Sequence, residues 1–176
     1  MSYALDVEQI KRARWTQVLI IMNIVVFIVA NVIVGYELLF KLGQLNVLVS
    51  EEGEWWRLFT AMFAHLDISH LFSNMLALVF VGSFCETRFP SKIMYLANYV
   101  ISGLVGNLFT LWILGPNSFS LGASGAIAGL YGSMIFLVNR RSQRFQIMSV
   151  LFLINFLVSS FQPGIGTWAH ILGLLT

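Results

Sequence analysis

The sequence predicts an all-α membrane protein, a polytopic transmembrane helical bundle with six spans, of which the sixth is incomplete. Hydrophobic residues make up 58% of the 176 positions. Charged residues make up only 10%, against roughly 25% in an ordinary soluble domain. Apolar windows that approach the length of a membrane span also recur along the whole chain. With a net charge of only +2, no nucleic-acid partner is expected.

Six apolar windows define the expected spans. They cover about residues 16–35, 69–86, 92–114, 124–139, 145–160 and 167–176. A helix needs roughly 17–25 residues to cross a bilayer, so the sixth window is expected to be a partial span. The first is expected to be a retained helix, because its apolar stretch is too long for a signal peptide and lacks a small-residue cleavage site. We predict a single domain over residues 1–176, in which residues 1–14 precede the first span.

The basic residues predict the orientation, because lysine and arginine are biased towards cytoplasmic loops. Eight of the ten basic residues lie before the first window, between the second and third, or between the fourth and fifth. Those three segments share one side of a six-span bundle. Five of the eight acidic residues lie on the opposite side, between the first and second windows. The amino terminus is therefore expected in the cytoplasm.

Polar side chains from three separate windows then come together in the outer part of the membrane. His70 and Asn74 are four residues apart near the start of the second window, on one helix face. Ser124 opens the fourth window, and His170 lies a few residues into the sixth. Each could simply pack or hydrogen bond between helices. Polar groups are costly in lipid, however, and their coincidence at one depth favours a functional site.

A serine and a histidine at one depth fit nucleophilic acyl transfer. The serine hydroxyl needs a base, and His170 is the only histidine outside the second-span region. No acidic residue lies in the fourth or sixth window, so a Ser–His dyad is favoured over a triad. His70, Asn74 and the backbone N–H of Ser124 are candidate donors to the oxyanion that attack creates. This chemistry needs no cofactor.

Glycines flank Ser124 where the loop turns into its helix. Gly122 allows a tight turn, and Gly125 leaves room for a neighbouring helix. The free N–H groups at a helix N-terminus favour a forming oxyanion. His65 and His70 could instead suggest a metal, but five residues turn a helix by about 500°, so the two would not share a face. No metal site is therefore expected.

Several short motifs occur together along the chain. They are Trp56-Arg57, then His65, His70 and Asn74 in AHLDISHLFSN, then Gly82 with Glu86, then Gly122-Ala123-Ser124-Gly125, and finally Ala169-His170 with Gly173. In these motifs the sequence resembles the rhomboid family of intramembrane serine proteases, of the bacterial six-span type. The resemblance implies that Ser124 is the nucleophile and His170 the base, that His70 and Asn74 line the oxyanion hole, and that the other motif residues support the site. It also implies that residues 36–64 form a partly inserted membrane hairpin in which Arg57 is structural.

The resemblance implies an endopeptidase that cuts other proteins in or near their transmembrane segments, at the outer face of the plasma membrane. Its partners are then transmembrane protein substrates and the lipid bilayer, and the sequence sets no oligomeric state. One position departs from the pattern, because Ala128 stands where family members often carry an aromatic residue under the catalytic imidazole; Tyr131 or Trp168 could substitute. Two alternatives stay open. A rhomboid-like pseudoprotease would bind client spans without cutting them, and a small transporter would show internal repeats or polar residues at several depths.

Overall fold

The computed structural model describes residues 7–137, 146–147 and 150 as a mostly helical chain. Three helical stretches in this part are long and apolar enough to cross a membrane, namely Arg14–Ile33, Ile68–Glu86 and Lys92–Ile113. A shorter apolar helix covers Ser124–Leu137. These four agree with the first four predicted windows. The windows at 145–160 and 167–176 lie largely or wholly outside the described residues, and His170 and Gly173 lie outside them too.

The spans are built from consecutive helical elements. The first span joins α2 (Arg14–Phe27) to the π-helical η1 (Ile28–Ile33). The second joins α6 (Ile68–Ala77), η3 (Leu78–Gly82) and α7 (Ser83–Glu86). The third is α8 (Lys92–Ile113), and α9 (Ser124–Leu137) is the fourth segment. A short helix, α1 (Val7–Arg12), precedes the first span.

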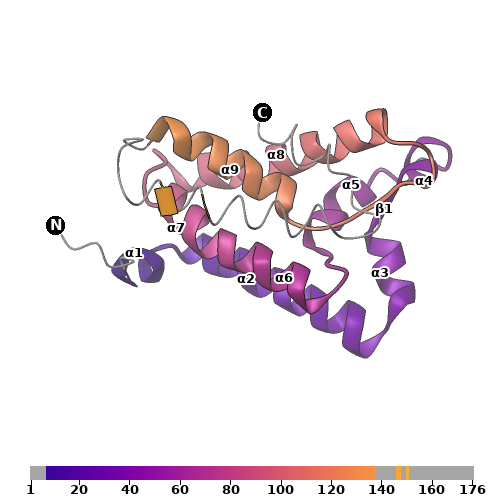
Figure 1. The fold of residues 1–176 in the computed structure, drawn as a ribbon, viewed down its shortest axis with the longest axis horizontal. Coiled ribbons are helices and arrows are strands. Elements are labelled where there is room, and N and C mark those ends of the chain that lie inside the picture. Colours follow the sequence, from indigo (N-terminus) through magenta and orange to yellow (C-terminus); the bar gives the residue numbers. More distant parts are fainter. Residues whose placement is uncertain (1–6, 138–145, 148–149, 151–176) are drawn as a thin grey trace.

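The loop between the first two spans folds into short elements at one end of the bundle. They are α3 (Tyr36–Leu42), β1 (Gln44–Leu45), α4 (Asn46–Ser50), α5 (Arg57–Thr60) and the 3-10 helix η2 (Ala61–Phe63). Figure 1 shows α3, α4, α5 and β1 at this end, with α1 and α7 at the other. Helix α9 packs against α8, η3 and α7, and α2 packs against α6, η3 and α7.

A two-stranded sheet places the start of α9 at the loop end. Strand β1 pairs antiparallel with β2 (Phe119–Ser120), in the register Gln44↔Ser120 and Leu45↔Phe119. The sequence does not predict this short pairing within the mostly helical chain, because a two-residue strand is too short to show the alternation that marks strands in a sequence. Through β2, the segment that leads to Ser124 is joined to the loop between the first two spans.

Arg57 holds that loop together from inside. Its side chain is only 4% exposed, and Nη1 donates to the carbonyls of Phe40 at 2.6 Å and Gly43 at 2.7 Å. These carbonyls belong to the C-terminal end of α3, where a cation interacts favourably with the helix dipole. The guanidinium also pairs with the Glu54 carboxylate. Arg57 therefore ties α3 to the start of α5. Whether residues 36–64 enter the membrane stays a prediction.

Glu86, at the end of the second span, caps the first span. Its buried carboxylate accepts the backbone N–H groups of Trp15 at 3.2 Å and Thr16 at 2.7 Å, and the Thr16 hydroxyl at 2.8 Å. The Thr16 hydroxyl is also 2.8 Å from the hydroxyl of Tyr95 on α8. The first N–H groups of a helix lack intrahelical partners and favour a negative charge. Gly82 makes this approach possible, since a Cβ there would lie 3.0 Å from the Thr16 methyl and 3.1 Å from the Tyr95 hydroxyl.

Helix α9 approaches α8 closely at two glycines. A Cβ at Gly129 would lie 1.9 Å from Oγ and 2.1 Å from Cβ of Ser102. A Cβ at Gly125 would lie 3.8 Å from its nearest neighbour, the Cα of Gly103. Small residues commonly allow such close contact between membrane helices. The contact is therefore tight at Gly129 and ordinary at Gly125.

We expect Gly129→Ala to lower the free energy of unfolding by about 1–3 kcal/mol, because the added methyl group forces α9 away from α8. Gly125→Ala, one helical turn earlier, is the matched control and is expected to be neutral or slightly stabilising. Thermal unfolding in detergent measures both. In a Ser102→Gly background, which removes the clashing atoms, Gly129→Ala should lose its effect. Equal effects of the two alanines would contradict the prediction.

Candidate active site

The backbone turns sharply just before Ser124. Gly122 has a φ of +119°, in the region that favours glycine, and its N–H donates to the carbonyl of Ala61 at 2.8 Å. The carbonyl of Ala123 accepts the N–H of Ile127 at 3.0 Å and so begins the hydrogen bonding of α9. Ser124 is the first residue of this helix and is half-buried. The hydroxyl therefore sits at the positive end of the helix dipole.

His70 of α6 lies directly against this turn. A Cβ at Gly122 would lie 2.8 Å from both Cε1 and Nε2 of the His70 ring. The carboxylate of Asp67 caps α6 by accepting the N–H groups of Ser69 at 2.8 Å and His70 at 2.9 Å. The imidazole and the serine thus both come from the first turn of a helix. The Gly122 turn brings these two helix ends together.

Several buried polar atoms gather beside the turn. His65, His70 and Asn74 are all 0% exposed. Within the described part of the chain, no group hydrogen bonds to either ring nitrogen of His70 or to the side-chain oxygen of Asn74. The Asn74 amide nitrogen donates to the His70 carbonyl at 2.9 Å. Each unsatisfied buried group costs about 1–3 kcal/mol, so a concentration of them is typical of a site that acts on a polar ligand.

The two histidines touch, contrary to the prediction from helix geometry. Their ring centroids are 5.0 Å apart, with the planes at 68°. The prediction was wrong because His65 lies in the loop before α6, where helical periodicity does not apply. Its carbonyl accepts the Asn31 side-chain amide of the first span at 3.2 Å. Among the described residues, no three histidine, cysteine or acidic side chains group in a way that could hold a metal ion.

Burial lowers the pKa of His65 to about 3, and the neighbouring His70 acts in the same direction. A histidine in the unfolded chain titrates near 6.5, so the unfolded state binds more protons between these two pH values. We therefore expect the free energy of unfolding to fall as the pH drops below about 6.5. Between pH 7.5 and pH 5 the loss due to His65 is about 2 kcal/mol. Thermal unfolding at both pH values checks this.

His65→Asn is the variant that isolates this effect. It removes the titrating ring and leaves His70 and Asp67 in place, so their contributions remain in both proteins. The variant should be less stable than the parent at pH 7.5 and should show a smaller loss on going to pH 5. An unchanged difference between the two pH values would contradict the assignment to His65.

Sequence reasoning missed a polar network that holds β1 against α8. The Gln44 amide donates to the Thr110 hydroxyl at 3.0 Å and to the Asn107 carbonyl at 3.0 Å. The Asn46 amide donates to the carbonyls of Thr110, Leu114 and Gly115 at the end of α8. This fixes β1, and through β2 the turn before Ser124. A usable signal was the pair of amides on either side of Leu45 in a chain poor in polar residues.

The remaining motif residues differ in their burial and in where they lie. Trp56 is 56% exposed, beside the buried Arg57. Gly125 faces α8, as described above. Ala128 and Tyr131 are both buried in α9. Trp168, named with Tyr131 as a possible support for the catalytic imidazole, lies outside the described residues, as do His170 and Gly173.

Residues 52–176 match the Rhomboid domain, which covers more than half of the chain. The chain belongs to the rhomboid family. Rhomboids are multi-pass membrane proteins, in agreement with the spans described above. The family consists mostly of serine proteases that act on membrane proteins. The turn at Gly122, the buried His70 and Asn74, and the half-buried Ser124 all lie within the matched residues.

Named rhomboids resemble the chain at similar levels. RHOMBOID-like protein 6, mitochondrial, of Arabidopsis thaliana is 39% identical over 143 residues, which cover 77% of this chain and 46% of the relative. Rhomboid protease AarA of Providencia stuartii is 31% identical over 155 residues, covering 72% of this chain and 55% of AarA. Inactive RHOMBOID-like protein 8 of Arabidopsis thaliana is 32% identical over 136 residues, which cover 73% of this chain and 38% of that relative. The chain thus spans about half of these relatives or less.

Proposed function

We propose that this rhomboid is an intramembrane serine endopeptidase that hydrolyses peptide bonds in or near the transmembrane segments of other membrane proteins. The observation that carries the proposal is the contact between the buried His70 ring and the Gly122 turn, two residues before Ser124. It brings the His70 imidazole, whose ring nitrogens have no hydrogen-bond partner among the described residues, against the turn before the helix that begins at Ser124, the proposed nucleophile. Rhomboid protease AarA supports the same reading by similarity.

In the proposed reaction, the Ser124 hydroxyl attacks the scissile carbonyl while His170 takes the hydroxyl proton. The carbonyl oxygen becomes an oxyanion. In this proposal, its negative charge is stabilised by hydrogen bonds from His70, the Asn74 amide and the Ser124 backbone N–H. His170 then gives the proton to the leaving amine. Water hydrolyses the acyl-enzyme with the same base, so the dyad needs neither a metal nor a cofactor.

The proposed orientation places the amino terminus in the cytoplasm and Ser124 towards the outer face of the plasma membrane. Residues 1–176 act as one domain. A helical substrate must unwind at the cut, because its carbonyls are otherwise hydrogen bonded within the helix. Substrates are therefore proposed to carry glycine, proline or other poor helix formers near the outer end of their span.

The test is cleavage of a single-span substrate protein by the purified chain in detergent, with the products identified by mass spectrometry. The proposal expects one defined cut in or next to the span. It also expects cleavage to be lost in His170→Ala, which leaves every residue of the described turn unchanged. Equal cleavage by the parent and by His170→Ala would refute the dyad.

A client-binding pseudoprotease is the second candidate, and the relative named inactive, at 32% identity, supports it. The two candidates differ in one measurement. An active dyad reacts covalently with a fluorophosphonate at Ser124, whereas a pseudoprotease binds the single-span protein and leaves both it and the probe intact. Binding without cleavage or labelling would favour the pseudoprotease.

A further inference from the structure

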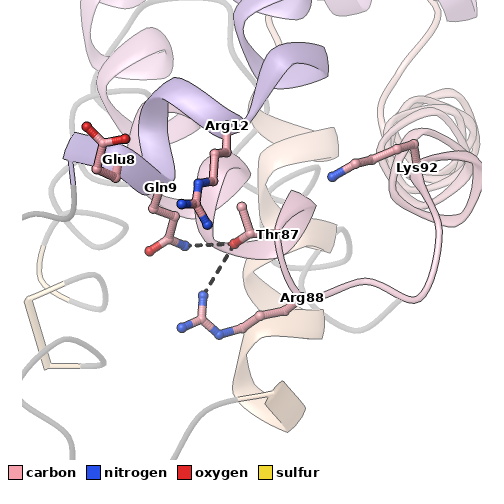
Figure 2. Close-up of a pocket in the computed structure, with 6 residues that line it drawn as sticks. All are labelled: Glu8, Gln9, Arg12, Thr87, Arg88 and Lys92. Atoms are coloured by element: carbon pink, nitrogen blue, oxygen red, sulfur yellow. Dashed lines mark hydrogen bonds between the residues drawn. The ribbon is translucent and has the colours of Figure 1, made fainter.

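A cavity of about 720 Å³ opens at the end of the bundle opposite Ser124, where α1 and α7 lie. This volume falls in the range of small-molecule binding sites. Six polar or charged side chains from α1, from the turn after α7 and from the start of α8 line it: Glu8, Gln9, Arg12, Thr87, Arg88 and Lys92 (Figure 2). None of them takes part in the proposed reaction at Ser124.

The lining of the cavity is mainly cationic. Lys92 pairs with the Glu86 carboxylate, 3.5 Å from its ammonium, so the net positive charge of the lining comes from Arg12 and Arg88, set against the carboxylate of Glu8. That carboxylate is itself balanced by Lys11, whose ammonium lies 3.0 Å away. A concave surface lined mostly by one sign of charge concentrates its field on a ligand of the opposite sign. The cavity therefore suits an anion.

Three of the polar groups that line the cavity, Gln9, Thr87 and Arg88, are held by contacts within the protein. The Gln9 amide donates to the Thr87 hydroxyl at 2.9 Å and so ties α1 to the end of the second span. The Arg88 guanidinium lies 3.7 Å over the ring of Phe84. Figure 2 shows Arg12 and Arg88 extending their guanidinium groups towards Thr87, with the Lys92 ammonium pointing towards them from α8. Planar guanidinium groups match the oxygens of a phosphate.

All three cations lie at the level where spans end. Arg12 precedes the first span by two residues, Arg88 follows the second by two, and Lys92 begins the third. This is the depth of lipid headgroups. Next to Lys92, Ile93 and Met94 are 78% and 50% exposed, so an apolar surface continues from the basic cavity along α8. A ligand with a charged head and apolar chains fits this combination.

We propose that the cavity binds the phosphodiester headgroup of an anionic phospholipid. The headgroup phosphate contacts Arg12 and Arg88 near Thr87, and the acyl chains lie along α8. Basic recesses between membrane helices are well suited to anionic lipids, and the anionic leaflet of a plasma membrane is its cytoplasmic one. The proposal does not rest on the protease activity and needs no cleavage assay.

The test is binding of phosphatidylglycerol to the purified protein in detergent, measured by native mass spectrometry. Phosphatidylcholine with the same acyl chains is the matched lipid, and inorganic phosphate is the soluble competitor. Each cation near the headgroup is worth about a fivefold change in affinity, so Arg12→Gln and Arg88→Gln should each weaken phosphatidylglycerol binding about fivefold. Together they should weaken it about 25-fold.

Arg14→Gln is the matched control, because Arg14 is an exposed cation at the same membrane level that does not line the cavity. The proposal expects this variant to bind phosphatidylglycerol like the parent, and expects millimolar phosphate not to displace the lipid. Equal binding of phosphatidylcholine, an equal loss in Arg14→Gln, or displacement of the lipid by phosphate would each overturn it. In the last case, the cavity would bind a soluble anion.

Discussion

Replacing Ser124 by alanine is expected to lower the turnover of a single-span substrate by about 10⁴- to 10⁶-fold, because removing the nucleophile of a serine protease costs about this much. The structure gives a reason to expect an intact fold. Ser124 is half-buried at the start of α9, and the turn before it is held by backbone contacts of Gly122 and Ala123. The thermal unfolding temperature in detergent should therefore stay close to that of the parent.

Ser118→Ala is the serine-matched control for this experiment. Ser118 lies in the same loop, and its hydrogen bonds to Gly115 and Asn46 are made by backbone atoms, so removing its hydroxyl leaves them in place. This variant should retain both turnover and stability. Residual cleavage by Ser124→Ala above about one per cent of the parent rate would exclude Ser124 as the nucleophile. The loss would then be less than about 100-fold, far below the roughly 10⁴-fold or greater loss expected when the nucleophile is removed.

Replacing Gly122 by valine is expected to have the largest effect on the fold of the site. The φ of +119° is strained for any residue with a Cβ, and the new Cβ would lie 2.8 Å from the His70 ring. Backbone strain of this kind costs about 1–3 kcal/mol, and forced displacement of a buried side chain adds a similar amount. We expect the free energy of unfolding to fall by about 2–5 kcal/mol. Turnover should fall at least 100-fold, since a shift of about 1 Å at reacting groups has that effect.

Gly115→Val provides the comparison, because Gly115 lies in the same loop without a positive φ. Apart from Gly115 and its two chain neighbours, no described residue has an atom within 4 Å of the place that its Cβ would take. Thermal unfolding and substrate cleavage should both remain near the parent values in this variant. Gly122→Ala carries the same backbone strain and the same Cβ contact without the bulk of valine, so it measures the combined effect of those two causes. Parent-like turnover in Gly122→Val would contradict the placement of His70 against the turn.

The elements that sequence patterns predict best here are the long apolar ones. The windows at 16–35, 69–86 and 92–114 correspond to helical stretches in the structure, because burial in lipid imposes a minimum length on a span. The sequence pattern does not predict β1 and β2. Their two-residue pairing depends on the hydrogen bonds that the Gln44 and Asn46 side chains make with α8. Those contacts join residues more than 60 positions apart, so no local pattern reports them.

In the candidate site, too, the sequence predicts some contacts and not others. The i, i+4 spacing of His70 and Asn74 within one helix follows from sequence, and both lie on α6. The contact between His65 and His70 does not follow, because it depends on where α6 begins, and the Asp67 cap sets that point. The contact of His70 with Gly122 also joins two distant segments. Motif order predicts which residues belong to the site, and tertiary packing determines which atoms meet.

The cap that Glu86 provides also bears on how the protein is made. The ribosome delivers Thr16 about 70 residues before Glu86, so the first span emerges and enters the bilayer with its leading N–H groups still bonded to water. Glu86, in turn, loses water only when those N–H groups are available to it. The start of the first helix therefore gains its carboxylate cap only when the second span packs against it, and until then water must satisfy those N–H groups.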